Sequence, residues 1–204
     1  MSLHEHFPDY FSRIPGITLY DPLAELLGAP VDGLLHYRFS DAVRLAGHAC
    51  PTVAIAWLST TRALTALYPQ SPPQRGQIEV ALGDCEDAGV AGVIASIAGL
   101  LTGAAGNGGF HGLGGQHRRR SLLQFGVNGV QQLRFRRCDT SQAVACQFNL
   151  AVVPGHPQTG VLLAGILAGE ASEEQRRLFA SLWQQRVERI LCQPEAYPGL
   201  LSLA

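Results

Sequence analysis

The sequence predicts one soluble globular domain that combines helices with strands. Apolar residues recur at helical spacing in 53–68 and 89–103, and residues 77–82 alternate in the manner of a strand. Two further strand-like stretches, 133–135 and 143–150, flank a turn as in a β-hairpin. With 204 residues, of which 47% are hydrophobic and 15% charged, the chain is long enough to bury one core. We therefore expect a single domain over 1–204.

Capping residues define the first two helices. Ser40-Asp41 predicts the start of a short helix that runs to about Ala46. Pro51 suits the first position of the next helix, which makes Cys50 its N-cap. That helix ends before the Ser71-Pro72-Pro73 turn.

The later helices differ in character. An acidic turn over 84–87 precedes the helix of 89–103, whose small residues suit close packing, and 159–168 reads as a short apolar helix. Ser172 with Gln175 forms a capping box that starts a final helix. We expect the apolar stripe of this last helix to pack on the core; it comprises Leu178, Phe179, Leu182, Trp183, Val187, Ile190 and Leu191.

Composition excludes several classes of function. The formal net charge of −1 offers no electrostatic case for nucleic-acid binding, and we read the two local arginine clusters as solvated faces. All 15 basic side chains are Arg, so the chain has no lysine for a Schiff base or a phosphate loop. No segment resembles a signal peptide or a membrane-spanning helix. We expect a cytoplasmic protein with no membrane partner.

The segment Gly47-His48-Ala49-Cys50-Pro51 is the strongest chemical signal in the sequence. Residues two apart in an extended segment project to the same face, so His48 and Cys50 can converge above the helix entrance. The unpaired N–H groups and the dipole of a helix N-terminus favour a thiolate there. A thiolate beside an imidazole predicts either a metal site or a reactive thiol.

The Gly-rich segment 103–115 is a second candidate, because seven of its thirteen residues are glycine. Such density suits tight turns and close backbone approach to a ligand or another chain. The segment lacks a G-x-G-x-x-G pattern and follows a helix, which argues against nucleotide binding. His111 within it is a candidate for a ligand or an acid/base group.

The five cysteines show no paired spacing and their number is odd, which argues against a disulfide scaffold and against a C-x-x-C zinc ribbon. Three of them, at 138, 146 and 192, fall in the hairpin or at a helix end, and we interpret these as structural. Cys85 lies in the acidic turn.

The stretch L-A-G-H-A-C-P-T, residues 45–52, resembles the F-H-G-H-x-C-P-G segment of the E-type subunit family of formylmethanofuran dehydrogenase. A weaker match over 89–103 follows in the right order, so the resemblance covers about 40–110. It implies an α+β fold with a mixed or antiparallel sheet packed against helices. Residues 116–204 lie outside the match, so we expect a single domain with a helical C-terminal extension. Within it, 40–115 would be the metal-binding core and 116–204 the hairpin plus C-terminal helices. It also implies a dimer and a transition metal, zinc foremost, on His48 and Cys50.

The sequence departs from this family at several positions. The first histidine of the motif is Ala46 here, the glycine after Cys-Pro is Thr52, and the loop lysine is Ala104. The family's second cysteine falls on Gly89, four positions after Cys85. The metal could be completed by Cys85, by another residue of 84–87 or by His111, and the sequence does not choose among them.

Two classes of function follow. The first is a metal-binding protein similar to that family, with His48, Cys50, Cys85 and His111 as candidate ligands and Zn²⁺ as the expected ion. The second is a metal-free enzyme with Cys50 as nucleophile and His48 or His111 as base. A pure assembly partner would use the same fold without chemistry. We expect a homodimer with the Gly-rich segment in its interface, and a small-molecule ligand is left open.

Overall fold

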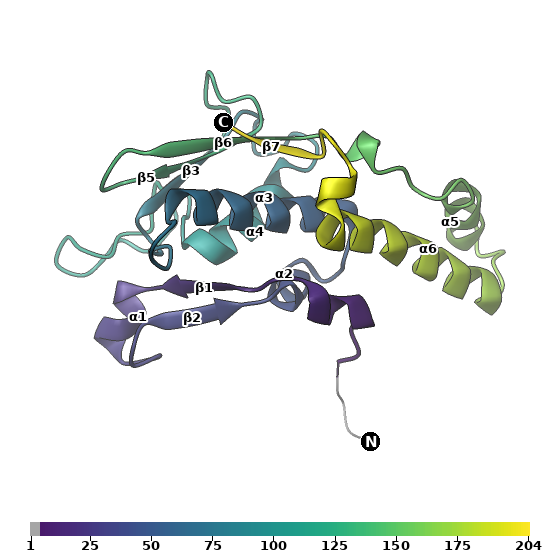
Figure 1. The fold of residues 1–204 in the computed structure, drawn as a ribbon, viewed down its shortest axis with the longest axis horizontal. Coiled ribbons are helices and arrows are strands. Elements are labelled where there is room, and N and C mark those ends of the chain that lie inside the picture. Colours follow the sequence, from purple (N-terminus) through teal and green to yellow (C-terminus); the bar gives the residue numbers. More distant parts are fainter. Residues whose placement is uncertain (1–4) are drawn as a thin grey trace.

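The computed structural model describes residues 5–204 and confirms the predicted α+β class. Figure 1 shows helices α3 and α4 between a larger sheet and a two-stranded ribbon formed by β1 and β2. The helices are α1 (Pro22–Leu27), α2 (Phe39–Ala46), α3 (Pro51–Leu67), α4 (Ala91–Thr102), α5 (Thr159–Leu167) and α6 (Glu173–Cys192), with short 3₁₀ turns η1 (Asp9–Arg13), η2 (Leu150–Val152) and η3 (Pro194–Ala196). The strands are β1 (Ile17–Tyr20), β2 (Leu34–Tyr37), β3 (Ile78–Leu82), β4 (Leu123–Gln124), β5 (Leu133–Arg137), β6 (Ala143–Phe148) and β7 (Leu201–Leu203).

The larger sheet is mixed and has five strands in the order β4-β3-β5-β6-β7. Strands β3 and β4 are parallel, whereas every other neighbouring pair is antiparallel. Phe135 at its centre lies opposite Val80 of β3 and Val144 of β6, so apolar side chains meet across three strands. The predicted β5–β6 hairpin is therefore present and lies between β3 and β7 in the sheet.

Helix α3 is the central element of the core. It begins at Pro51, as predicted, and Cys50 is its N-cap. Its side chains from Val53 to Thr60 are all buried, because α2, α4, α6 and the larger sheet surround it. The predicted small-residue helix is also present as α4, which ends in a left-handed Gly103 with φ of 72°.

The sequence analysis did not predict the N-terminal ribbon, α1 or the edge strand β7. These elements span three to six residues each, too few to show a clear period. The α2 cap also differs from the prediction, since the helix begins one residue before Ser40. Asp41 lies in the first turn and accepts a hydrogen bond from the Arg38 backbone N–H at 2.8 Å.

Helices α5 and α6 pack against each other as a helical hairpin that extends beyond the rest of the molecule (Figure 1). Ser172 caps α6 by accepting from the Gln175 N–H, as predicted. Only part of the predicted apolar stripe reaches the core: Val187 and Ile190 are fully buried, but Leu178 is 42% exposed. The expectation that the whole stripe packs on the core is therefore wrong, because the first half of α6 has only α5 beside it.

Candidate functional site

The predicted motif at the start of α3 is present, but its two side chains have separate surroundings. The Cys50 sulfur is half-buried and lies 3.5 Å from the Val53 backbone nitrogen, whose N–H it accepts. The exposed His48 ring has Nδ1 2.9 Å from the Ala46 carbonyl oxygen. Among residues 5–204, no hydrogen bond joins His48 to Cys50.

The backbone of this motif is held by α6. The Ala49 carbonyl oxygen accepts from Trp183 Nε1 at 3.1 Å and from Gln184 Nε2 at 3.3 Å. The Tyr10 hydroxyl in turn donates to Gln184 Oε1 at 2.7 Å. These contacts anchor the entrance of α3 to α6, which gives the segment a structural role.

The structure contradicts the predicted metal-binding function. Within residues 5–204, no group of three or more His, Cys, Asp or Glu side chains is close enough together to hold a metal ion. A closed structural zinc site takes four ligands, and a catalytic site takes three with one open position. The prediction of a metal-binding protein that uses His48, Cys50, Cys85 and His111 is therefore wrong.

His111 lies far from Cys50 because of the chain path. Its neighbour Phe110 accepts backbone N–H groups from Arg119 and Arg120, and Arg119 contacts Asp21 beyond the C-terminal end of α3. Cys50 lies at the other end of this helix, whose 17 residues span about 25 Å. In Figure 1 the Gly-rich segment and the start of α3 lie on opposite sides of the molecule. This separation removes His111 as the base for Cys50.

Cys85 and the acidic turn follow β3, which packs against α4. The turn is held by the segment after β4, where the Gly126 N–H donates to the Asp84 carbonyl at 2.9 Å. In the described part of the chain, no hydrogen bond or ion pair connects 84–87 to His48 or Cys50. The acidic side chains remain exposed instead.

All five cysteines are free thiols, in agreement with the prediction that the chain has no disulfide scaffold. Burial raises the pKa of the Cys146 thiol to about 12, and burial also raises the pKa of Cys192 and of Cys138. A raised pKa keeps a thiol protonated and unreactive at neutral pH. The buried Cys146 and the half-buried Cys192 therefore suit the structural role that the sequence analysis gave them, whereas Cys138 is exposed.

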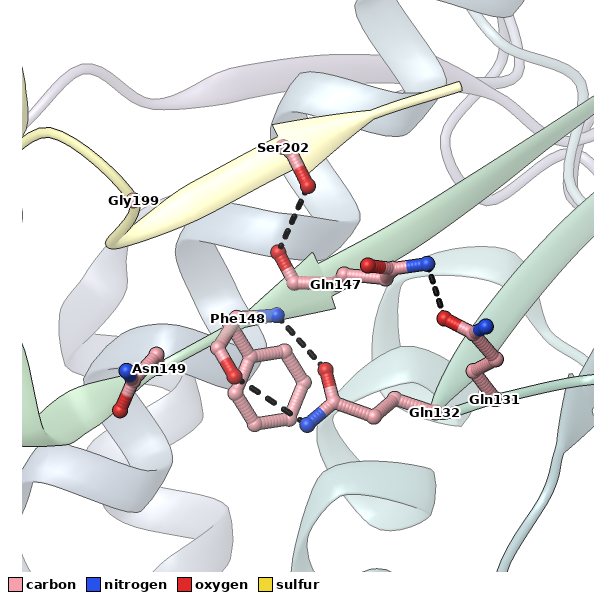
Figure 2. Close-up of a pocket in the computed structure, with 7 residues that line it drawn as sticks. All are labelled: Gln131, Gln132, Gln147, Phe148, Asn149, Gly199 and Ser202. Atoms are coloured by element: carbon pink, nitrogen blue, oxygen red, sulfur yellow. Dashed lines mark hydrogen bonds between the residues drawn. The ribbon is translucent and has the colours of Figure 1, made fainter.

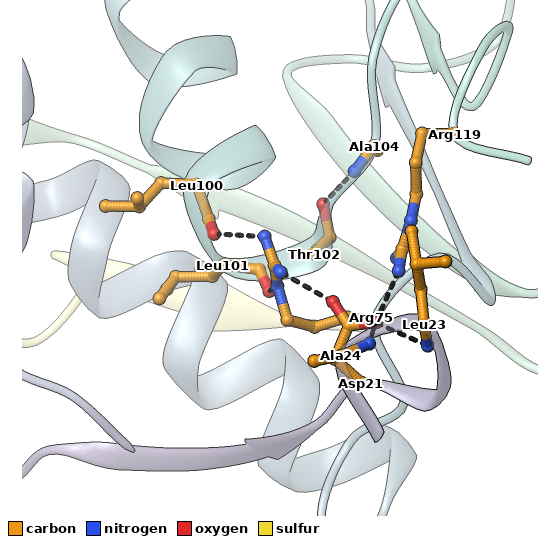
Figure 3. A network of polar contacts seen from close by, with 9 residues as sticks. All are labelled: Asp21, Leu23, Ala24, Arg75, Leu100, Leu101, Thr102, Ala104 and Arg119. Atoms are coloured by element: carbon orange, nitrogen blue, oxygen red, sulfur yellow. Dashed lines mark hydrogen bonds and ion pairs between the residues drawn. The ribbon is translucent and has the colours of Figure 1, made fainter. Parts of the chain in front are cut away.

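A buried ionic network replaces the predicted sites as the main polar feature of the interior (Figure 3). The Asp21 carboxylate is 6% exposed and accepts from Arg75 at 2.7 Å and from Arg119 at 2.6 Å. It also caps α1 by accepting the N–H groups of Leu23 and Ala24. Asp followed by Pro is a typical helix N-cap sequence, so the capping role of Asp21 could have been predicted. No pattern in the sequence identified the two arginine partners of Asp21.

The charges of this network determine its protonation. Burial by itself would raise the pKa of Asp21, but the positive charges of Arg119 and Arg75 and the backbone N–H donors outweigh burial and lower it. Arg75 also donates to the Leu100 and Leu101 carbonyls at the end of α4. The network thus ties the N-terminal ribbon, the turn before β3 and the end of α4 together.

Arg119 also explains why the Gly-rich segment is ordered within one chain. A Cβ atom on Gly76 would lie 2.2 Å from an Arg119 guanidinium nitrogen, and one on Gly103 would lie 2.7 Å from it. These two glycines leave the space that the buried guanidinium fills. Backbone hydrogen bonds close the segment further: the Gly109 N–H donates to the Gly106 carbonyl at 3.0 Å, and the Ala105 N–H donates to the Arg119 carbonyl at 3.0 Å.

Two glycines of this segment should respond differently to substitution. Gly112 has φ of 96°, and a Cβ there would lie 2.2 Å from the Gln116 carbonyl oxygen, whereas a Cβ on Gly108 meets nothing within 4 Å. We expect Gly112→Ala to lower the free energy of unfolding by about 1–3 kcal/mol. Gly108→Val should change it by less than about 0.5 kcal/mol. Urea unfolding followed by circular dichroism measures both, and equal effects would contradict this account of the segment.

An amide-lined pocket of about 380 Å³ lies beside β6 and β7 (Figure 2). Its polar groups are used by the strands themselves. The Gln132 side chain accepts from the Phe148 N–H at 2.6 Å and donates to the Phe148 carbonyl at 3.1 Å. Gln147 donates to Gln131, and Ser202 donates to the Gln147 carbonyl. The amides extend the backbone pairing, so this pocket is better explained as part of the sheet.

Helix α5 presents the most unusual surface of the molecule. Its sequence, TGVLLAGIL, carries no charge, and none of its residues is buried. Val161 and Leu167 are each 78% exposed, and Leu178 of the neighbouring α6 lies partly exposed too. A helix that is apolar all round is normally covered, and exposed apolar patches of this kind mark interaction sites.

Comparisons with known proteins identify no relative of this chain. No protein-family model matches the chain, and a search of the curated proteins finds no match. No helix within residues 5–204 is long and apolar enough to cross a membrane.

Proposed function

We propose that the protein is an assembly component that forms a homodimer through the α5–α6 hairpin. The observation that carries this proposal is helix α5, an uncharged helix with no buried side chain. Burying an exposed aliphatic side chain contributes about 1.5–3 kcal/mol. Covering Val161 and Leu167 in a partner interface therefore supplies a driving force that the single chain leaves unused.

The hairpin has the shape and spacing for close packing. Gly160, Ala164 and Ala168 recur at intervals of four and are all exposed, so a second helix can approach the α5 backbone closely. A stable interface buries roughly 800 Å² on each partner. Nine residues of α5 are too few for that area, so the first half of α6 belongs to the same surface.

The charges that border this surface favour a second copy of the same chain. Glu173 and Glu174 open α6, and Arg176 and Arg177 follow within one turn. In a twofold arrangement with α6 helices antiparallel, the acidic start of one helix faces the basic residues of the other. The apolar centre of the surface carries no charge to repel its own copy.

The resemblance to the formylmethanofuran dehydrogenase family agrees with this role. The matching component of that enzyme is named as one of its accessory subunits, and residues 40–110 carry the motifs that resemble it. That relationship remains a prediction. We propose the hairpin as the dimer interface in place of the Gly-rich segment, because Arg119 of the same chain orders that segment.

The test is the mass of the protein in solution. Analytical ultracentrifugation at about 10 µM should give 43.6 kDa, twice the 21.8 kDa of one chain. The double variant Val161→Glu/Leu167→Glu should sediment at 21.8 kDa, because charged side chains cannot be buried unpaired in the interface. Its stability should be unchanged at low protein concentration, since α5 contributes no buried side chain.

Leu26→Glu/Leu27→Glu on α1 is the matched control, because those leucines are 61% and 67% exposed on another surface. This variant should stay dimeric. A wild-type mass of 21.8 kDa would refute the proposal, and so would dissociation of the α1 variant with the α5 variant still dimeric.

A further inference from the structure

A groove crosses one face of α3 and consists of two adjoining cavities. One has a volume of about 360 Å³ and is lined by the segment that enters β1, including Ile14 and Ile17. The other has about 200 Å³ and is lined by the segment that runs from η3 to β7, including Tyr197 and Leu201. Both cavities share Leu58 and Arg62 of α3.

The face of α3 in this groove is built by helical spacing. Leu58, Thr61, Arg62 and Thr65 lie at i, i+3, i+4 and i+7, so they share one side of the helix. Arg62 is the one charged residue in the α3 sequence. The hydroxyl groups of Thr61 and Thr65 donate to backbone carbonyls of the same helix. Arg62 therefore provides the cationic hydrogen-bond donors of a groove whose other walls are largely apolar.

Arg62 already holds a carboxylate at this place. Its NH2 group donates to Glu195 Oε1 at 2.8 Å, and the two side chains are 51% and 83% exposed. An ion pair with that exposure contributes only about 0–1 kcal/mol. A ligand carboxylate in a less exposed position can replace Glu195 at little cost.

We infer that this groove binds a small monocarboxylate with an apolar body, with the ligand's carboxylate on Arg62 and its body against Leu58 and Ile17. Arginine suits this role because its planar N–H groups match the two oxygens of a carboxylate. Arg62 borders both cavities, so a ligand whose carboxylate is on Arg62 can place its apolar body in the cavity of about 360 Å³. The inference does not depend on the proposed dimer, because no α5 residue lines the groove.

The test uses 4-phenylbutyrate and octanoate as probes, with their uncharged amides as paired controls, in isothermal titration calorimetry. At least one carboxylate should bind saturably with a 1:1 ratio and a Kd below about 10 mM, and its amide should bind at least tenfold more weakly. Arg62→Gln should weaken the carboxylate at least tenfold, since hydrogen bonds to a charged group contribute about 1.5–3 kcal/mol. Glu195→Gln should tighten it by up to about fivefold, because the internal competitor is gone.

Arg44→Gln serves as the matched control, because Arg44 is an exposed arginine with carboxylate partners away from the groove. It should bind the probe like the wild type. The inference is overturned if neither carboxylate binds, if the amides bind equally well, or if Arg62→Gln and Arg44→Gln have equal effects. The affinity for the probe is measured independently of the sedimentation mass. A monomeric protein that binds the probe would therefore refute the proposed dimer and leave the inference about the groove standing.

Discussion

Asp21→Asn should lower the free energy of unfolding by about 3–5 kcal/mol at pH 7, because it leaves the buried Arg119 and the half-buried Arg75 without their shared counterion. Asparagine has the same shape and is a good N-cap, so the hydrogen bonds to the start of α1 are kept. The loss of stability therefore measures the contribution of the negative charge of Asp21. Among the described residues, Arg119 already has one buried nitrogen without a hydrogen-bond partner, so little else there can compensate.

The effect of this substitution should depend on pH in a defined direction. The pKa of Asp21 is lowered in the folded protein, so its charge stabilises the fold fully above the unfolded pKa of about 3.9. That stability is lost as the pH falls through the folded value, where the wild-type carboxyl becomes neutral like the amide. We expect the wild-type and Asp21→Asn curves to run parallel above about pH 5 and to converge below about pH 4.

Urea unfolding at a series of pH values tests both statements. Glu5→Gln is the matched control, because its ion pair with Arg44 is exposed on both sides and lies outside the proposed interface, so its loss should change the stability little. A loss below about 1 kcal/mol for Asp21→Asn at pH 7 would contradict the assigned role of the network. A gap that widens toward low pH would also contradict it.

Phe135→Ala should lower the free energy of unfolding by about 3–5 kcal/mol. Phe135 is completely buried in the central strand β5, with valines opposite it on both neighbouring strands. Removing the ring loses its transfer free energy and leaves a cavity that β-strands paired on both sides cannot close.

The same measurement on Phe110→Ala provides the comparison. Phe110 lies in the Gly-rich segment with its side chain 43% exposed, so its loss should cost less than about 1 kcal/mol. Similar losses for the two variants would mean that the sheet is not the centre of the core.

Local features of this chain could be predicted because they depend on neighbours in the sequence. The start of α3 at Pro51, the Ser172 cap of α6 and the hairpin of β5 and β6 each follow from residues within one turn or one strand pair. The ribbon strands β1 and β2 and the edge strand β7 were missed because four or fewer residues do not establish a period.

The candidate sites depended on contacts that local patterns do not contain. His48, Cys50 and His111 are the residue types of a metal site, and the resemblance put the first two in one motif. The length of α3 and the anchoring of the Gly-rich segment by Arg119 then placed His111 at the other end of the helix. The sequence could name the chemistry of each side chain without determining the distance between them.

The sequence by itself determined the α+β composition, the main helix boundaries and the lack of a disulfide framework, because caps, periodicity and cysteine spacing act over a few residues. Only the tertiary structure decided that Asp21 meets Arg75 and Arg119, that Arg62 lies between two cavities, and that α5 stays uncovered. The ion pairs of Asp21 and Arg62 join side chains that are separated by between 54 and 133 positions in the sequence. The exposure of α5 depends on which surfaces remain after the core has formed. These contacts and exposed surfaces are determined by the packing free energy of the whole chain, to which every segment contributes.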